Sequence, residues 1–111
     1  MDKIIKVKEK EYKFRLTSWQ IRQLEEREET GIMFIMTKAE ESGRILEPII
    51  KIMHAALQYY QKDMSLEQTY ELYDDLVEHE KWTMDEFGDL VKVILETAGL
   101  STRRSEEVKK K

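Results

Sequence analysis

The chain has 111 residues, of which 41% are hydrophobic and 38% are charged, and its formal net charge is −4. This length suits one domain, because domains usually contain about 100–150 residues, and the apolar fraction is sufficient to form a core. The sequence has no cysteine, which excludes disulfides, thiolate metal sites and cysteine nucleophiles.

The charge is distributed unevenly along the chain. Residues 1–16 carry six basic and three acidic groups, residues 101–111 carry five and two, and the body between them carries eight and 18. This acidic body repels a phosphate backbone, so we expect no nucleic-acid partner. The longest apolar runs fall short of the ~18 residues that a membrane span needs, and the N-terminus lacks the apolar block of a signal peptide. We therefore expect a cytoplasmic protein that does not bind membranes.

The first 16 residues predict a β-hairpin. Apolar and charged residues alternate there with a period of two, and a polar stretch, residues 8–11, separates the two runs. We expect strands near residues 3–8 and 11–16. Because a lone hairpin is marginally stable in water, it must pack on the helices that follow or pair with another chain. Its buried face would consist of Ile5, Val7, Tyr12, Phe14 and Leu16.

Five short helices are predicted after the hairpin. Three of them begin with a capping box, in which a serine or threonine precedes a glutamine or glutamate by three residues. Gly31 is expected to end the first helix, since glycine readily adopts a left-handed conformation, and residues 40–44 are expected to form a loop. The predicted helices span about residues 18–29, 31–41, 47–62, 66–81 and 84–98. The capping boxes are Thr17 with Gln20, Ser65 with Gln68, and Thr83 with Glu86.

The apolar pattern assigns these helices different positions in the core. The helix after Pro48 is apolar on nearly every face, which indicates a central helix or one that another protein covers. The others are amphipathic. In the first helix we expect Trp19, Ile21 and Leu24 to be buried. In the last two helices, the expected buried residues are Leu66, Tyr70, Tyr73, Leu76, Val77, Met84, Phe87, Leu90, Val91, Ile94, Leu95 and Ala98.

The fold class predicted from these elements is α+β and mostly helical. The hairpin would pack on about five short helices in one domain, residues 1–100. Residues 101–111 contain one sizeable hydrophobe, Val108, and five basic residues. Such a segment cannot bury enough apolar surface to offset its ordering entropy, so we expect a flexible basic tail.

The sequence offers few groups for catalysis or for binding a metal or cofactor. It lacks a glycine-rich phosphate loop, a Gly-x-Ser-x-Gly elbow and a His-Glu-x-x-His helix. His54 lies inside the apolar helix, and His79 follows Asp75 by four residues without a third metal ligand in view. Asp74, Asp75 and Glu78 fit a solvated helix face better than an acid–base pair. We therefore expect no enzyme, no cofactor and no bound metal.

Methionines and aromatic residues are the most informative group for function. Methionine is unbranched and polarisable, so surfaces rich in it adapt to varied apolar partners. Any one of these residues could belong to the core. A small domain has limited interior volume, however, so we expect part of the group to contact a partner protein or a second copy of the chain. The candidate partner-binding residues are Met33, Phe34, Met36, Met53, Tyr59 and Tyr60.

The order of these features resembles the small tail assembly chaperones of long-tailed bacteriophages and related prophages. The resemblance covers most of residues 3–100. It is carried by Ile4-Ile5-Lys6-Val7, by Tyr12-Lys13-Phe14-Arg15-Leu16-Thr17, by Ile21-x-x-Leu24-Glu25-Glu26 with Gly31 after it, by the helical segment 49–57, and by Ala98-Gly99-Leu100.

The resemblance implies a non-enzymatic protein of the infected host cytoplasm. Such a protein binds the long, aggregation-prone tape measure protein and keeps it soluble until the tail tube polymerises around it. The acidic body would help to keep the complex soluble through like-charge repulsion, and self-association into a homo-oligomer could strengthen repeated weak contacts. A competing hypothesis is a regulatory adaptor whose acidic face, with Asp74, Asp75 and Glu78, binds a basic protein.

Overall fold

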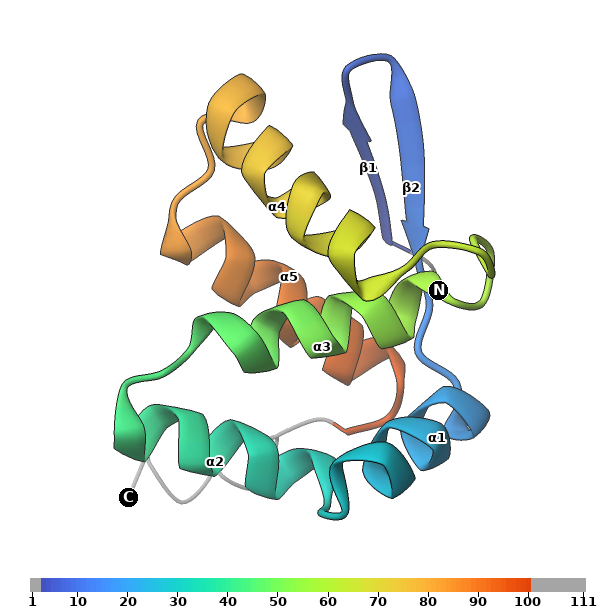
Figure 1. The fold of residues 1–111 in the computed structure, drawn as a ribbon, viewed down its shortest axis with the longest axis vertical. Helices are drawn as coiled ribbons and strands as arrows, with labels where there is room; N and C mark the ends of the chain where they lie inside the picture. The colour runs from blue at the N-terminus through green and yellow to red at the C-terminus, as the bar shows by residue number, and fades with distance from the viewer. Residues whose placement is uncertain (1–2, 101–111) are drawn as a thin grey trace.

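An antiparallel hairpin and five helices make up residues 3–100, the part of the chain that the computed structural model describes (Figure 1). This confirms the predicted α+β, mostly helical fold. The expected tail at 101–111 lies outside the described residues. Within residues 3–100, all of the helices are too short or too polar to cross a lipid bilayer. The elements are β1 (Lys3–Val7), β2 (Lys10–Phe14), α1 (Ser18–Glu28), α2 (Ile32–Ser42), α3 (Leu46–Leu57), α4 (Leu66–Glu80) and α5 (Met84–Thr97).

The hairpin turns more tightly than the sequence predicts. Val7 pairs with Lys10, so only Lys8 and Glu9 lie in the turn, and both have a positive φ. Two-residue turns of this kind match the twist of the flanking strands, although glycine or asparagine is usual in them. The predicted polar turn over residues 8–11 was therefore too long.

The hairpin packs on the helices of its own chain. The amide of Arg15 donates a hydrogen bond to the carbonyl of Ala56, at the end of α3 (2.9 Å). The side chain of Gln61 accepts from the Lys13 amide (3.1 Å) and donates to the Lys13 carbonyl (3.2 Å) and to the Leu57 carbonyl (3.0 Å). Gln61 thus occupies the outer edge of β2, where a third strand would otherwise pair.

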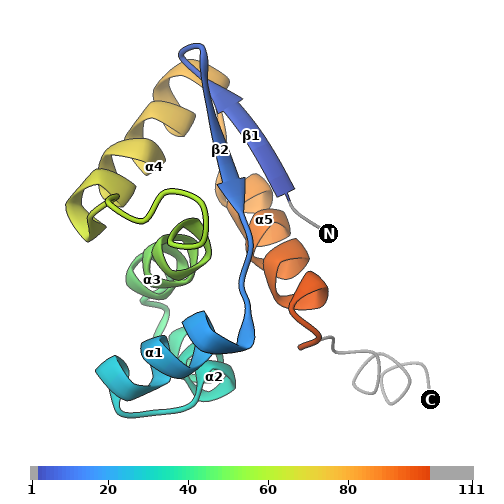
Figure 2. The same ribbon diagram turned by 90° about the vertical axis from the view of Figure 1, so that its right-hand side faces the viewer.

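Helix α3 is the centre of the fold. It contacts α1, α2, α4, α5 and β2, and Figure 2 looks along it with the other helices arranged around it. The all-round apolar pattern of this segment therefore indicated its position correctly. The buried residues of α3 are Ile49, Ile50, Ile52, Met53, Ala55, Ala56 and Leu57.

The predicted end of this central helix was wrong. The helix ends at Leu57, five residues before the predicted end, because side chains hold the following segment in a turn. His54 Nε2 donates to the carbonyl of Met64 (3.1 Å), and Gln58 Nε2 donates to the same oxygen (2.9 Å). Tyr59 and Tyr60 consequently lie in a turn rather than on a helix.

Local capping explains most of the other helix boundaries, which agree with the predicted ranges to within one residue. All three predicted capping boxes are present. Gly31 does not end α1, however. Glu29 takes the left-handed conformation there, and Gly31 has a φ of −74° as the N-cap of α2. Helix α2 continues to Ser42, before the left-handed Gly43, so much of the predicted loop at 40–44 is helical.

The amphipathic faces of α4 and α5 were predicted with unequal success. In α5, Phe87, Leu90, Val91 and Ile94 are buried as expected, whereas Met84 is exposed. In α4, the buried residues are Thr69, Leu72 and Leu76, while Leu66 and Val77 are exposed. Leu76 is buried and Tyr73 packs against the core as expected, but Thr69 and Leu72 complete the buried face in place of Leu66 and Val77. Helix α4 contacts α3 and β1.

Aromatic stacking fixes α4 against α5. Tyr73 stacks on Phe87 with 4.3 Å between the ring centroids, and Trp82 meets the same ring edge-on at 5.0 Å. Such pairs stabilise by about 0.5–1.5 kcal/mol beyond the area that they bury. Trp19 on α1 differs, because 56% of its surface is exposed and it does not join Ile21 and Leu24 as expected.

Candidate functional site

Met33 and Phe34 form an exposed apolar pair at the start of α2. Their side chains are 43% and 57% exposed, whereas Met36 is half-buried against the core. Single exposed apolar residues are ordinary on protein surfaces, but adjacent ones beside a groove are typical of binding sites. Of the predicted partner-binding residues, these two are the most exposed.

The prediction that Met53 is one of the partner-binding residues needs correction. It lies in the middle of α3 and is completely buried in the core. The central helix is enclosed by neighbouring elements, so this methionine contacts other core side chains and presents nothing to a partner. Tyr59 and Tyr60 are exposed, but they lie in the turn after α3 and form a separate surface.

A groove of about 400 Å³ lies beside Phe34, between α2 and α3. In Figure 1 these helices run in opposite directions, one below the other. Phe34, Ile35 and Ala39 contribute apolar surface from α2, and Pro48 contributes from α3. The remaining residues that line the groove are Glu28, Thr30, Lys38, Ser42, Arg44, Glu47 and Lys51.

An ion-pair network closes the α3 side of this groove. Lys51 Nζ lies 2.5 Å from a carboxylate oxygen of Glu28 on α1 and 2.8 Å from one of Glu47 on α3. The hydrogen bonds to these two carboxylates raise the pKa of Lys51, and the Lys51 ammonium lowers the pKa of Glu47. These charges are already paired, so an apolar segment can bind in the groove without leaving them unpaired.

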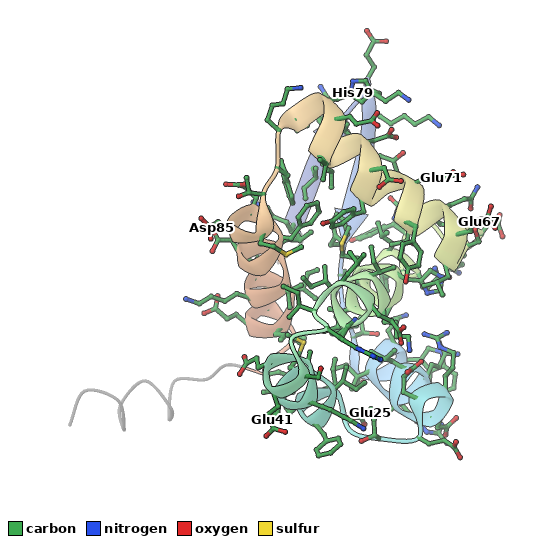
Figure 3. The ribbon with its side chains drawn as sticks, turned by 60° about the vertical axis from the view of Figure 1, so that its left-hand side comes forward. Glu25, Glu41, Glu67, Glu71, His79 and Asp85 are labelled. Carbon is green, nitrogen blue, oxygen red and sulfur yellow. The ribbon has the colours of Figure 1, made fainter. Side chains whose placement is uncertain are left out.

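Glu25 positions the exposed start of α2. The N-cap of α2 is Gly31, which has no side chain, and the Glu25 carboxylate accepts a hydrogen bond from the Ile32 amide instead (2.8 Å). Figure 3 labels Glu25 beside the connection between α1 and α2. A carboxylate at a helix N-terminus also interacts favourably with the helix dipole. This contact fixes the direction in which α2 leaves α1.

Replacing Glu25 with alanine should loosen α2 at its first turn. The free energy of unfolding is expected to fall by about 1 kcal/mol, because the cap and its interaction with the helix dipole are lost. Hydrogen exchange at the amides of Ile32, Met33 and Phe34 should become faster. Glu25→Gln keeps an oxygen acceptor and should have a smaller effect. Unchanged exchange in Glu25→Ala would show that Glu25 does not hold this helix end.

His54 supports the turn that carries Tyr59 and Tyr60. The Met64 carbonyl can only accept, so the proton must lie on Nε2 of the ring. Nδ1 is then buried without a hydrogen-bond partner among the described residues. Burial lowers the pKa of His54, the hydrogen bond to Met64 raises it by a smaller amount, and the charge of Arg27 lowers it further. The histidine is therefore neutral near pH 7.

Because of His54, the free energy of unfolding should fall as the pH drops below about 6.5, the ordinary histidine pKa. The pKa of His54 is lower in the folded state, so the unfolded chain takes up the proton first and the equilibrium shifts toward unfolding. The slope can reach at most about 1.4 kcal/mol per pH unit for one group. Urea unfolding between pH 7.5 and 5 should show this loss in the wild type and in the exposed-site control His79→Gln. It should be absent in His54→Gln, and an equal loss in that variant would contradict the assignment.

An acidic group of side chains lies at the far end of α4, as the sequence predicts. Asp75, Glu78 and His79 offer ligand atoms that all lie within 4.8 Å of one another, so the structure adds Glu78 to the pair considered from the sequence. The ammonium of Lys8 lies 3.7 Å from Asp75 and opposes the binding of a cation. Glu78 and His79 are exposed, and we read this group as a solvated acidic surface.

A groove of about 530 Å³ continues this acidic surface between the hairpin and α4. Glu11, Asp63, Glu71 and Asp75 contribute carboxylates to its lining, and Lys10 contributes one positive charge. Burial and the negative charge of Asp75 raise the pKa of Tyr12, which also lines this groove.

Sequence reasoning missed a third surface, around Trp19. At 100° per residue, Trp19 points more than about 120° away from both Ile21 and Leu24 on a helix. The spacing therefore contained the information that its side chain faces outward. In the structure, Trp19 lines a groove of about 540 Å³ with Tyr59.

No protein family, curated protein or solved structure matches the chain.

Proposed function

We propose that this protein binds apolar segments of another protein and keeps them soluble in the host cytoplasm. The resemblance to phage tail assembly chaperones suggests the tape measure protein as the client. The observation that carries the proposal is the exposed pair Met33 and Phe34 beside the groove between α2 and α3. This role would need no catalytic group.

The geometry of α2 suits an apolar client. Phe34, Ile35 and Ala39 give the α2 wall apolar surface beside Lys38 and Ser42. The flexible side chain of Met33 at the start of the helix can adapt to different sequences. An apolar helix or loop that covers this wall would gain about 25 cal/mol for each Å² of apolar surface removed from water. The paired charges of Lys51 on the opposite wall remain satisfied.

The charge of the domain suits the same role. Residues 17–100 carry eight basic and 18 acidic groups, so several copies bound along one client would repel one another. Repulsion between like-charged particles opposes aggregation. An acidic domain with one apolar surface can therefore hold a poorly soluble client in solution.

Co-expression tests the proposal. We would produce the protein together with the longest protein encoded directly downstream of its gene and ask whether that partner moves from the pellet to the soluble fraction and co-purifies. The double variant Met33→Gln, Phe34→Ser should lose this activity. Met84→Gln is a matched control, since Met84 is also exposed (39%) but lies at the start of α5. All variants should retain the circular dichroism spectrum and melting temperature of the wild type.

One outcome would contradict the proposed function, and a second would contradict the assignment of α2 as its binding surface. The partner could remain insoluble in the presence of the wild-type protein or be equally soluble without it. Alternatively, the double variant could solubilise the partner as well as the Met84→Gln control does. The second outcome would leave a chaperone role in place but would exclude α2 as its binding surface.

A second candidate function is an adaptor that binds a basic protein through the acidic face of α4. Figure 3 shows Glu67 and Glu71 along the side of this helix that faces away from α5, with His79 at its far end. The acidic groove between α4 and the hairpin adds to this surface. An adaptor of this kind should lose its partner on Asp74→Asn, Glu78→Gln and on raising the salt concentration. The variants of Met33 and Phe34 should not affect it.

A further inference from the structure

Three aromatic side chains on one side of the domain each carry a cation over the ring. Arg15 Cζ lies 4.7 Å from the ring centroid of Tyr59, and Lys13 Nζ lies 5.3 Å from that of Tyr60. Arg22 Cζ lies 5.6 Å from that of Trp19. We call these six residues the cation–aromatic surface. Tyr59 and Tyr60 also meet edge to face at 4.8 Å.

Tertiary contacts bring this surface together from three parts of the chain. Lys13 and Arg15 belong to β2 and the residue after it, Trp19 and Arg22 to α1, and the tyrosines to the turn after α3. The hydrogen bonds of Gln61 to Lys13 attach the strand to this turn, and the bond of Arg15 to Ala56 attaches it to the end of α3. The arrangement is therefore held by hydrogen bonds to the backbone of Lys13 and Arg15 as well as by the cation–aromatic contacts.

A groove of about 540 Å³ runs through the surface, between α1 and the turn. Trp19, Gln20, Gln23, Gln58, Tyr59 and Lys62 line it. Within residues 3–100, no carboxylate contributes to this lining, although the chain has 23 acidic residues. The groove between α4 and the hairpin, which Gln61 and Asp63 of the same turn also line, is acidic. The turn thus separates two grooves of opposite chemical character.

From this juxtaposition we infer that the cation–aromatic surface binds an extended acidic segment of a partner protein. Trp19 and Tyr59 supply apolar faces for aliphatic side chains, and the amides of Gln23 and Gln58 can bond to an extended backbone. Lys62 and Arg22 supply the charges for carboxylates. Arg22 pairs with Glu26 at 3.1 Å, but both side chains are largely exposed, so a carboxylate of the partner can replace that contact at little cost.

An acidic peptide fits this surface better than a single-stranded nucleic acid. Nucleotide bases bind to such surfaces by stacking on open aromatic faces. Here a cation of the same chain lies over one face of each ring. The acidic body of the domain repels any anionic chain that extends beyond the groove, so it favours a short acidic segment over a long polyphosphate backbone. This second surface is separate from α2, and the inference does not rest on the proposed function.

Trp19 fluorescence provides a direct test. In a Trp82→Phe variant the emission comes from Trp19 alone, because the chain has two tryptophans. The probe is a peptide of about twelve residues in which glutamate alternates with alanine and leucine, long enough to cross the groove in an extended conformation. We expect a saturable change in emission. The apparent Kd should rise at least about tenfold between low and high salt, since the contacts are charge-dependent. The same peptide with glutamine in place of glutamate should have little effect.

Paired variants separate a specific site from general charge attraction. Arg22→Gln, Lys62→Gln should weaken binding at least about tenfold, which corresponds to the loss of two charged contacts. Lys10→Gln, Lys92→Gln removes the same charge from exposed positions outside the groove and should leave the Kd within about twofold. The α2 variant Met33→Gln, Phe34→Ser should also bind normally, so failure here is distinguishable from failure of the proposed function.

Three results would overturn the inference. One is the absence of any saturable response to the glutamate peptide. Another is equal weakening by the groove variant and by the charge-matched control. The third is tighter binding of a thymidine oligonucleotide of about twelve residues than of the peptide, which would make the surface a nucleic-acid site.

Discussion

Met53→Ala should lower the free energy of unfolding by about 2–5 kcal/mol, the range for truncation of a buried methionine. Met53 is completely buried on the central helix, so the missing atoms leave a cavity that five surrounding elements cannot fill without moving. Urea unfolding followed by circular dichroism measures the change. Met33→Ala is the matched control, because the same truncation at an exposed position should cost less than about 0.5 kcal/mol.

Only one of the two methionine variants should affect function. Met33→Ala should weaken client solubilisation in the co-expression assay while the protein remains stable. Met53→Ala should solubilise the client normally at temperatures at which the variant stays folded, because its side chain does not reach the surface. A stable Met53→Ala protein that fails to bind the client would contradict the burial of this residue in the functional state.

Gln61→Ala should loosen the attachment of the hairpin to the helices. The side chain makes three hydrogen bonds, two of them to Lys13 and one to Leu57. Their loss should reduce the free energy of unfolding by about 1–3 kcal/mol, since partly buried backbone groups lose their partners. Hydrogen exchange at the Lys13 amide should increase more than exchange at amides in the middle of α4.

Gln61→Glu offers a sharper version of this experiment. A carboxylate has nearly the same shape as the amide, but it cannot donate to the carbonyls of Lys13 and Leu57. The variant should therefore be less stable than Gln61→Ala at pH 7. These carbonyls favour the protonated acid, so the pKa of the introduced carboxyl group would be raised in the folded state, and the deficit should shrink as the pH falls toward about 4. A deficit that does not change with pH would show that the donor function of Gln61 is unimportant.

The elements of the fold followed from local patterns, whereas several of their boundaries did not. Capping boxes at Thr17, Ser65 and Thr83 each depend on residues three positions apart, so the sequence shows them directly. The end of α3 depends on the hydrogen bonds of His54 and Gln58 to Met64, and the position of the turn after it depends on Gln61 with Lys13, 48 positions away. Such long-range contacts leave no periodic pattern.

The candidate site shows the same distinction between local and tertiary information. Met33 and Met53 are the same residue type in apolar surroundings, and only the packing around α3 places one outside and the other inside. The cation–aromatic surface combines residues from three separate segments, so it was invisible from any one of them. Trp19 is the exception, because its angular position on α1 could have shown that it faces outward.

The side-chain bonds of Gln61 also limit how this protein can associate with other chains. An exposed strand edge can recruit further strands and allow a sheet to grow from molecule to molecule. At β2 this edge is occupied by a glutamine of the same chain, so sheet growth is blocked on that side. A protein that exposes Met33 and Phe34 can therefore offer apolar side chains to a partner without also offering the backbone of β2 as a template for aggregation.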